Sequence, residues 1–427
     1  MAGDEDYNLK SQRRLYLDNA ATSFPKPPCV TQAMLRYANE VGASAGRGAY
    51  AEARESGRIL AQCRKRFNAL IHGESPNHII FTLNASDALN LAIHGLITRA
   101  RHEPGGHVVT TRMEHNSVLR PLNELVRLGE IEQSRIKCDP RTGLVDPDEI
   151  KNAIRPDTRF VAVIHGSNVT GTLQPITEIG AICRNRNIPF VVDAAQTVGH
   201  VPIDVQRMNI DFLAMPGHKG LLGPLGTGAL YIRPGVENRL ATIREGGTGS
   251  LSELDTQPDF LPDRFEPGSH NAIGIAGLNA SVKWILDRKV DSIRAHEEEL
   301  MRTMIDALQN GAPDHHSLRY FGPKNIADRC GVFSVRIDGH TPNDLANILE
   351  NQFGLLTRAG IHCAPLAHKT IGTHHLGGTT RLSFGAFTTA QDVKYAADAL
   401  CKLANEQAEK CVVSAVSTKR DHAKSTA

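Results

Sequence analysis

The sequence predicts an α/β fold in which a large domain with a mostly parallel sheet precedes a smaller α+β domain. Strand-like and helix-like segments alternate through the first part of the chain, which is typical of α/β folds. Continuous apolar runs at 160–164, 188–192 and 212–215 are typical of strands buried on both faces of a parallel sheet. Two long amphipathic patterns, 271–288 and 291–309, then indicate connecting helices.

Within the large domain, apolar runs lead into helix-like patterns. The further expected strands are 79–82, 108–111 and 228–232, and the expected helices begin near Ser86 and Ser117 and cover 176–185. The run 228–232 indicates an antiparallel hairpin return, because it closely follows the run at 212–215.

The pattern changes after residue 309. Residues 331–337 alternate between apolar and polar side chains, as a half-exposed strand does, and 380–384 indicate another alternating strand. Thr341 is a suitable N-cap for a helix with an early proline at 342, and a final helix is expected over 389–403.

Four segments are therefore expected along the 427 residues. Polar composition at both ends is typical of mobile termini. The expected segments are a flexible N-terminal segment 1–15, a large domain 16–285, a small C-terminal domain 286–410 and a disordered tail 411–427.

Composition limits the classes of function. With 41% apolar residues, 22% charged residues and a net charge of +2, the chain resembles an ordinary globular protein, and no overall field favours nucleic acid or an anionic membrane. No apolar stretch approaches the length of a membrane-spanning helix, and the acidic N-terminus lacks the apolar core of a signal peptide. A cytoplasmic location is the expectation.

The eight cysteines show no CxxC pair and no spacing typical of a zinc site, so no metal site is expected. In a reducing compartment most of them should be small buried hydrophobic residues. Only Cys363 has a sequence context that suggests chemistry.

Two charged residues follow neighbouring apolar runs. Asp193 ends the run 188–192, and Lys219 follows 212–215 within a Gly-His-Lys-Gly sequence. Because ligand sites in open α/β sheets lie beyond the carboxyl ends of the strands, both should reach one edge. An amine that forms a Schiff base and a carboxylate that keeps a pyridine nitrogen protonated are what pyridoxal phosphate (PLP) requires. The alternatives are a solvated lysine and a helix N-cap at Asp193.

Further polar residues follow other strands. Ala85 and Ser86 begin a helix whose backbone N–H groups and Ser86 hydroxyl suit a phosphate, although an N-cap explains this segment equally well. His115 is placed to stack on a cofactor ring, and Gln196 to reach its phenolic oxygen; a structural histidine is the alternative at 115.

The order of these motifs resembles the class V aminotransferase family, the fold-type I PLP enzymes that include the cysteine desulfurases. The resemblance covers Tyr16 to Leu403, and Arg358–Ala364 resembles the active-site cysteine loop of the SufS-like branch, which also contains selenocysteine lyases. The motifs are Leu-Asp-Asn-Ala-Ala-Thr at 17–22, Glu-His-Asn-Ser at 114–117, Ser-Asn-Val-Thr-Gly at 167–171, Asp-Ala-Ala-Gln at 193–196, Gly-His-Lys at 217–219 and Arg-Leu-Ser at 381–383.

The resemblance implies a seven-stranded, mostly parallel sheet and a role for each matching residue. It assigns Lys219 to the Schiff base, Asp193 to the pyridine nitrogen, His115 to ring stacking and to catalysis, and Gln196 to the ring oxygen. Asn168 would lie near the ring or substrate, and Arg381 would bind the substrate carboxylate. The phosphate would be bound by Ala85, Ser86 and His218, with Ser269 supplied by the second subunit of a homodimer.

Three departures from the family pattern indicate a divergent subfamily. Pro216 stands where many SufS-like members have a serine that donates to the phosphate, and Ser269 stands where threonine is common. The segment 365–373 also differs from the better known loop of that branch.

The implied reaction converts L-cysteine to L-alanine and leaves the sulfur on Cys363 as a persulfide, for iron–sulfur cluster assembly or another sulfur-acceptor protein. His362 is a candidate for ionising the Cys363 thiol. Selenocysteine lyase, another C–S lyase and an aminotransferase are alternatives with the same cofactor, and a non-enzymatic scaffold is the alternative without it.

Overall fold

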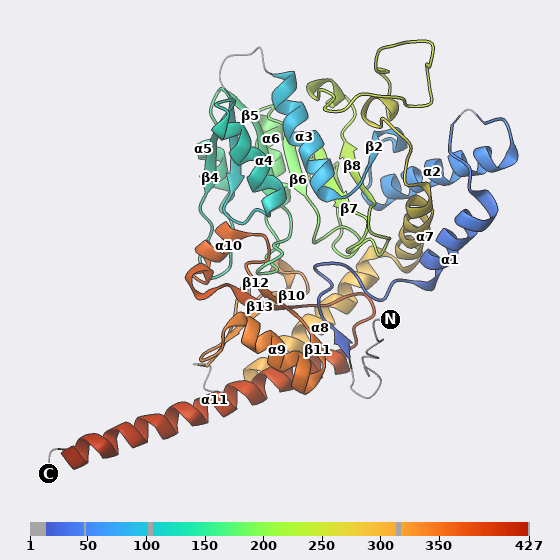
Figure 1. Ribbon diagram of the computed structural model, residues 1–427. Coiled ribbons are helices and arrows are strands. Elements are labelled where there is room, and N and C mark those ends of the chain that lie inside the picture. Colours follow the sequence, from blue (N-terminus) through green and yellow to red (C-terminus); the bar gives the residue numbers. More distant parts are fainter. Residues whose placement is uncertain (1–13, 47, 101–105, 313–316, 426–427) are drawn as a thin grey trace, which may run out of the picture.

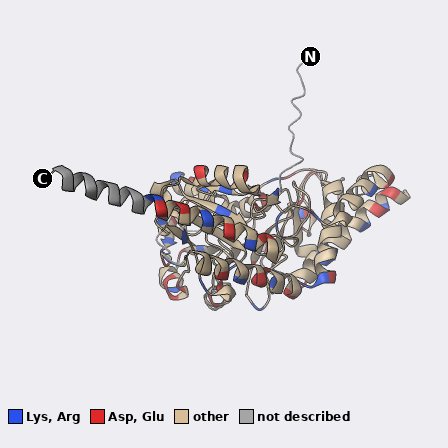
Figure 2. Ribbon diagram, turned by 90° about the horizontal axis from the view of Figure 1, so that it is seen from below, with Lys and Arg blue, Asp and Glu red and all other residues tan. Residues whose placement is uncertain are grey.

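The computed structural model describes residues 14–46, 48–100, 106–312 and 317–425, with side chains described to residue 410. The predicted flexible segment 1–15 lies almost entirely outside these residues. In the described part of the chain, no helix has both the length and the apolar character needed to cross a membrane. Lys and Arg are interspersed with Asp and Glu over the elements seen in Figure 2.

The large sheet has seven strands in the order β2-β8-β7-β6-β5-β3-β4, and only β8 runs antiparallel to its neighbours. The predicted seven-stranded, mostly parallel sheet and its hairpin return are confirmed. The strands are β2 Ile79–Thr82, β3 His107–Thr111, β4 Glu132–Ile136, β5 Thr158–Ile164, β6 Phe190–Asp193, β7 Phe212–Pro216 and β8 Gly228–Ile232.

Helices cover both faces of this sheet (Figure 1), which explains its continuous apolar strands. Along β7, Phe212 and Ala214 belong to a cluster with α3 and α4, whereas Leu213 and Met215 belong to the cluster on the opposite face. Helices α3 (Ala85–Arg99) and α4 (Asn116–Arg127) lie on the first face. The second face is covered by α2 Ala51–Leu70, α5 Pro147–Ala153, α6 Ile176–Asn185 and α7 Ala272–Arg288, with α1 Pro28–Arg36 against α7.

The smaller part contains a four-stranded antiparallel sheet in the order β12-β13-β10-β9. The predicted cap of α9 is confirmed, because Thr341 and Asp344 form a reciprocal capping box. The elements are α8 Val290–Gly311, β9 Leu318–Tyr320, β10 Val332–Ile337, α9 Pro342–Phe353, β12 Arg358–Gly360, α10 Pro365–Thr370, β13 Thr379–Ser383 and α11 Ala390–Ser425. A parallel pair joins β1 (Leu15–Tyr16) to β11 (Leu355–Leu356). Short helical segments lie at Tyr37–Val41, Pro76–His78, Glu237–Arg239, Asp263–Phe265, Ile326–Asp328 and His374–Leu376.

The prediction that β10 is half-exposed is wrong, and β13 is buried as well. One face of β10 packs against α8 and α11, as Phe333 and Val335 show. Its polar residue Ser334 faces the large domain, where its hydroxyl donates to the carbonyl of Val169 at 2.6 Å. An alternating strand is therefore compatible with two covered faces when its polar residues are hydrogen-bonded.

The disordered tail at 411–427 stays a prediction; in the structure α11 continues to Ser425 and projects away from the body of the protein (Figure 1). This segment contains no glycine or proline, and several of its residues are good helix formers. The predicted domain boundary at 285–286 stays a prediction, and it falls inside α7. Leu17, which the prediction places in the large domain, packs with the C-terminal elements.

Candidate active site

The carboxyl ends of β6 and β7 lie side by side and open into a cavity of about 310 Å³. Asp193 is the last residue of β6, and Lys219 follows the end of β7 by three residues. The cavity brings together eight residues singled out from the sequence: Ala85, Ser86, His115, Asn168, Asp193, Gln196, His218 and Lys219. Pro216, the noted departure, also lines it.

Asp193 is only 2% exposed, and its Oδ1 accepts the N–H of Ala195 at 2.9 Å. Burial raises the pKa of Asp193, whereas the Ala195 N–H and the Lys219 ammonium oppose this shift. The residues that follow form turns and no helix, so the N-cap alternative for Asp193 is wrong.

Lys219 lies between glycines that let backbone segments approach one another closely. A Cβ on Gly217 would meet the hydroxyl of Thr227 at 2.1 Å, and one on Gly220 would meet the carbonyl of Val198 at 2.4 Å. The glycines thus serve protein packing rather than only the approach of a ligand. Burial lowers the pKa of Lys219 to about 8, although Asp193 opposes the shift.

The N-terminus of α3 faces the cavity with free hydrogen-bonding capacity. Asn84 is the N-cap and accepts the N–H of Asp87 at 2.9 Å, so capping does not use Ser86. The Ser86 hydroxyl lies 2.6 Å from that of Ser117. Because donors in the first turn of a helix have no intrahelical partner, this end of the cavity suits an anion.

His115 caps α4 by accepting the N–H of Ser117 on Nδ1 at 3.1 Å. Burial, with Lys219 and nearby arginines, lowers its pKa to about 4, so the ring is neutral near pH 7. Gln196 donates from Nε2 to the carbonyl of Ala20 at 2.9 Å. Its side chain is thus tied to the N-terminal segment.

Two buried polar atoms at this cavity have no partner among the described residues: Nδ1 of His218 and Oδ1 of Asn168. Unsatisfied buried groups mark a site that a polar ligand completes. Together with Asp193, Lys219 and the α3 N-terminus, they fit the pyridine nitrogen, aldehyde and phosphate of PLP.

Arg381 in β13 reaches the site from the smaller domain and is 2% exposed. One terminal nitrogen bonds Asp18 Oδ1 at 2.6 Å, the other donates to the carbonyl of Asn168 at 3.1 Å, and Nε has no partner in the described structure. Burial lowers the pKa of Arg381, and Asp18 opposes the shift. The sequence interpretation missed Asp18 as the partner, although its motif contains this carboxylate.

Cys363 lies exposed in the four-residue connection from β12 to α10. Its carbonyl accepts the N–H of Asn116 at 2.8 Å. The hypothesis that His362 ionises this thiol stays a prediction; the His362 ring bonds the Thr379 hydroxyl through Nε2 at 3.1 Å and packs against His368. Burial also holds the pKa of His362 well below its usual value, so the ring is neutral.

Ser269 does not line the Lys219 cavity of its own chain. It lies beside a separate groove with Arg64, Glu266 and His270. Its predicted contact with a second subunit's phosphate site stays a prediction.

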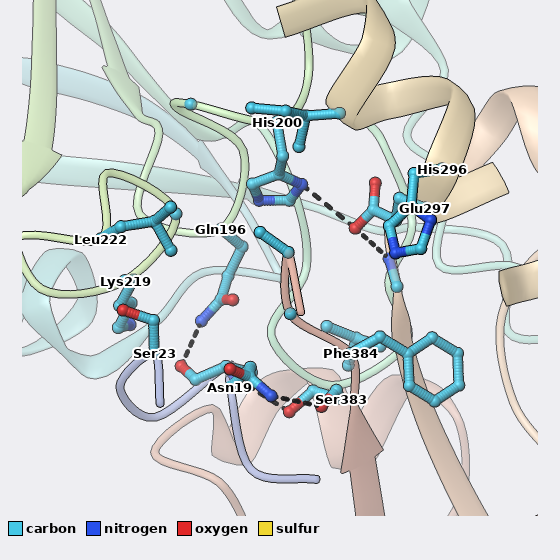
Figure 3. A pocket seen from close by; sticks show the side chains of 18 residues that line it. Asn19, Ser23, Gln196, His200, Lys219, Leu222, His296, Glu297, Ser383 and Phe384 are labelled. Atoms are coloured by element: carbon cyan, nitrogen blue, oxygen red, sulfur yellow. Dashed lines mark hydrogen bonds and ion pairs between the residues drawn. The ribbon is translucent and has the colours of Figure 1, made fainter. Parts of the chain in front are cut away.

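A second, smaller cavity of about 60 Å³ is also lined by Lys219 and Gln196 (Figure 3). His200 faces Glu297 across it, with 3.1 Å between Nδ1 and Oε1, and Glu297 also accepts the N–H of Gly331 at 2.8 Å. Burial would raise the pKa of Glu297, but its positive neighbours lower it to about 2. This contact joins α8 to the loop after Asp193. Among the described residues, no group of three His, Cys, Asp or Glu side chains has an arrangement that holds a metal.

The family model for aminotransferase class-V matches residues 15–396. The chain belongs to the aminotransferase class-V family. Within it, the chain is 36% identical over 398 residues to a probable cysteine desulfurase of Methanothermobacter thermautotrophicus, covering 91% of this chain and 94% of the relative. It is 30% identical over 409 residues to the cysteine desulfurase IscS of Clostridium botulinum, covering 93% and 96%.

Solved structures of this family agree with the fold. An apo cysteine desulfurase from Thermococcus onnurineus NA1 superimposes with a TM-score of 0.84 at 30% identity, over 92% of this chain and 95% of that one. The S-sulfonic acid form of the cysteine desulfurase CsdA from Escherichia coli gives a TM-score of 0.80 at 26% identity, over 92% and 94%. The predicted fold class and family are thereby confirmed.

Proposed function

We propose that the protein is a PLP-dependent cysteine desulfurase that converts L-cysteine to L-alanine and takes the sulfur onto Cys363. The observation that carries this proposal is the convergence of three groups from distant segments. Asn168, which lines the Lys219 cavity, donates to the carbonyl of His362 beside Cys363 at 2.6 Å and accepts from Arg381 at 3.1 Å, so hydrogen bonds join the exposed thiol's loop to the amine's cavity and to the guanidinium. The desulfurases among its relatives, matched over about nine tenths of the chain, support the same activity.

PLP would be held by Asp193 at its pyridine nitrogen, Lys219 at its aldehyde, His115 against its ring, and Ala85, Ser86 and His218 at its phosphate. When bound, the cofactor supplies an electron sink that acidifies the Cα–H of an amino acid. Gln196 and Asn168 would complete the polar contacts of the ring. The Oδ1 of Asn168 is free to accept, whereas its Nδ2 is occupied.

Lys219 has a pKa of about 8, so a useful fraction of its amine is neutral near pH 7 to 8. That neutral amine accepts the Cα proton of the substrate and returns a proton to the product. The neutral imidazole of His115, fixed through Nδ1, can hold or deliver a proton at Nε2.

Arg381 binds the substrate carboxylate, a task suited to a rigid guanidinium that Asp18 and the Asn168 carbonyl already orient. The thiolate of Cys363 then attacks the substrate sulfur. The S–S bond forms as the Cβ–S bond breaks, and the enzyme thiol plus cysteine become an enzyme persulfide plus alanine.

The finer parts of the proposal rest on the sequence. The short connection that carries Cys363 supports the SufS-like branch, and the exposed Ser269 supports a homodimer in which each subunit completes the other's phosphate site. A sulfur-acceptor protein and a cytoplasmic location also remain proposals.

The deciding experiment compares the wild type with Cys363→Ala, Lys219→Ala and a matched Cys29→Ala control on cysteine and selenocysteine. A desulfurase loses sulfide release in Cys363→Ala by about a hundredfold or more, whereas Cys29→Ala keeps it. Lys219→Ala should lose all activity, and activity retained there would overturn the scheme. Selenide release that persists in Cys363→Ala, with no sulfide release by the wild type, would favour selenocysteine lyase. A protein that gains no visible absorption with PLP would favour the scaffold.

A further inference from the structure

The backbone that carries Cys363 has an unusual conformation. His362 and Cys363 have φ values of 50° and 58°, so two consecutive non-glycine residues lie in the left-handed region. Each such residue is unfavourable in an unconstrained chain. This step therefore persists only where neighbouring groups hold it, and strained residues of this kind cluster at functional sites.

Contacts from the large domain hold the carbonyl groups of this step. Asn168 donates from Nδ2 to the carbonyl of His362 at 2.6 Å, and the backbone N–H of Asn116 donates to the carbonyl of Cys363 at 2.8 Å. On the other side, the His362 ring bonds the Thr379 hydroxyl of β13. These contacts fix the carbonyls of both residues and one edge of the His362 ring. The face of that ring needs a further packing partner.

His368 supports that ring from α10. It is fully buried, and its ring centroid lies 5.4 Å from that of His362. Its Nδ1 lies 2.8 Å from the Thr373 hydroxyl, and the N–H of Thr373 donates to the His368 carbonyl at 2.9 Å. The carbonyl of Ile361 also lies close enough to the His368 ring to act on its pKa. His368 thus packs against the ring of His362, and its backbone N–H donates to the carbonyl of Ala364 at 3.2 Å, without lining the Lys219 cavity.

We propose that His368 is a positioning residue, which through the His362 ring holds Cys363 in the left-handed conformation that presents the thiol to the substrate. The proposal rests on the proposed function, because it assumes that Cys363 receives sulfur. Since His368 does not reach the cavity, its loss should slow sulfur transfer and leave substrate binding intact.

The test compares the wild-type holoenzyme with His368→Phe, Thr373→Val and the double variant. His368→Phe keeps a ring against His362 and removes both nitrogens, whereas Thr373→Val removes the bond to Nδ1 from the other side and keeps His368. Lys369→Ala is the matched control, because this neighbour on α10 has an exposed side chain. Cysteine affinity is read from the change in cofactor absorption, and sulfur transfer from the single-turnover rate of persulfide formation on Cys363 by mass spectrometry.

We expect His368→Phe to slow persulfide formation about ten- to a hundredfold, since small displacements of a reacting group have effects of this size. The Kd for cysteine should stay within about twofold, because only the thiol moves. The double variant should be no slower than His368→Phe, since both substitutions remove the same hydrogen bond between His368 Nδ1 and the Thr373 hydroxyl. Thr373→Val alone keeps the test valid if His368→Phe does not fold. A persulfide rate unchanged in both single variants, or a fall matched by an equal rise in Kd, would overturn the proposal.

A second readout needs neither cofactor nor activity. In the apoprotein, hydrogen exchange at the amides of Asn116 and Ala364 reports the bonds that close on the carbonyls of Cys363 and Ile361. His368→Phe should speed exchange at both sites, and Lys369→Ala should not. If the wild type forms no persulfide but the exchange still differs, the proposed function fails while His368 keeps its positioning role. Equal exchange in an active enzyme refutes that role alone.

Discussion

Glu266→Gln should lower the free energy of unfolding by about 3 kcal/mol, the lower end of the range for breaking a buried ion pair. The Glu266 carboxylate is 2% exposed and accepts a hydrogen bond from each terminal nitrogen of Arg64. The Nη1–Oε1 distance is 2.6 Å and the Nη2–Oε2 distance is 2.5 Å. It also accepts the N–H of Phe81 at 2.5 Å and lies 3.1 Å from Nε2 of His270. A glutamine keeps one acceptor oxygen but turns an amide donor toward Arg64, whose buried charge then lacks a counter-ion.

The effect should depend on pH. Burial alone would raise the pKa of Glu266, but Arg64 and His270 lower it overall. A carboxyl group with a lowered folded pKa contributes stability above its unfolded pKa of about 4.5 and loses it as the pH falls through the folded value. The difference between wild type and Glu266→Gln should therefore shrink below about pH 4.5.

Urea unfolding followed by circular dichroism measures both quantities. Glu124→Gln is the control, because Glu124 forms an exposed pair with Arg127 and its loss should change stability little. Arg64→Met combined with Glu266→Gln should cost clearly less than the sum of the single changes, since the pair is removed as a unit. Strictly additive costs, or a Glu266→Gln variant as stable as Glu124→Gln, would refute the reasoning.

Three further substitutions test the site. Arg381→Lys should raise the Kd for cysteine about ten- to a hundredfold in an absorption titration, because a lysine cannot reproduce the guanidinium fork. Burial raises the pKa of Glu114 to about 8, so Glu114 contributes stability that is lost as the pH rises from about 4.5 to 8, and the difference in unfolding free energy between wild type and Glu114→Gln, measured in urea, should change over this range. Asn168→Ala leaves the His362 carbonyl without its donor, so single-turnover persulfide formation should fall about 5- to 150-fold. An unchanged value in any of these measurements contradicts the role assigned to that residue.

The large sheet was predictable because each of its central strands is apolar on both faces. In β7, the alternating residues Phe212 and Leu213 face opposite helical layers, and a short continuous apolar run is typical of a strand covered on both faces. The burial of β10 was not predictable, because Ser334 finds its partner in Val169, 165 residues away. A local pattern carries no information about which distant surface covers a strand.

The site shows the same division. The motifs placed Asp193 and Lys219 at one edge because β6 and β7 are adjacent and parallel. The orientation of His362 could not be read from its position beside Cys363, because it depends on Thr379 and His368 in elements that follow. Sequence proximity identifies which residues are present, whereas hydrogen bonds to other elements decide where each ring points.

Asn168 joins three parts of the site that sequence analysis treats separately. Its Oδ1 lies free at the cofactor cavity, its Nδ2 holds the His362 carbonyl, and its own carbonyl accepts from Arg381. If Arg381 shifts when it binds a carboxylate, it therefore moves the backbone carbonyl of Asn168, the residue whose side chain holds the Cys363 loop. Residues that share a hydrogen-bond network show non-additive substitution effects. The combined Arg381→Lys and Asn168→Ala variant should thus differ from the product of the single effects on persulfide formation. Simple multiplication would mean that substrate binding and thiol positioning are independent.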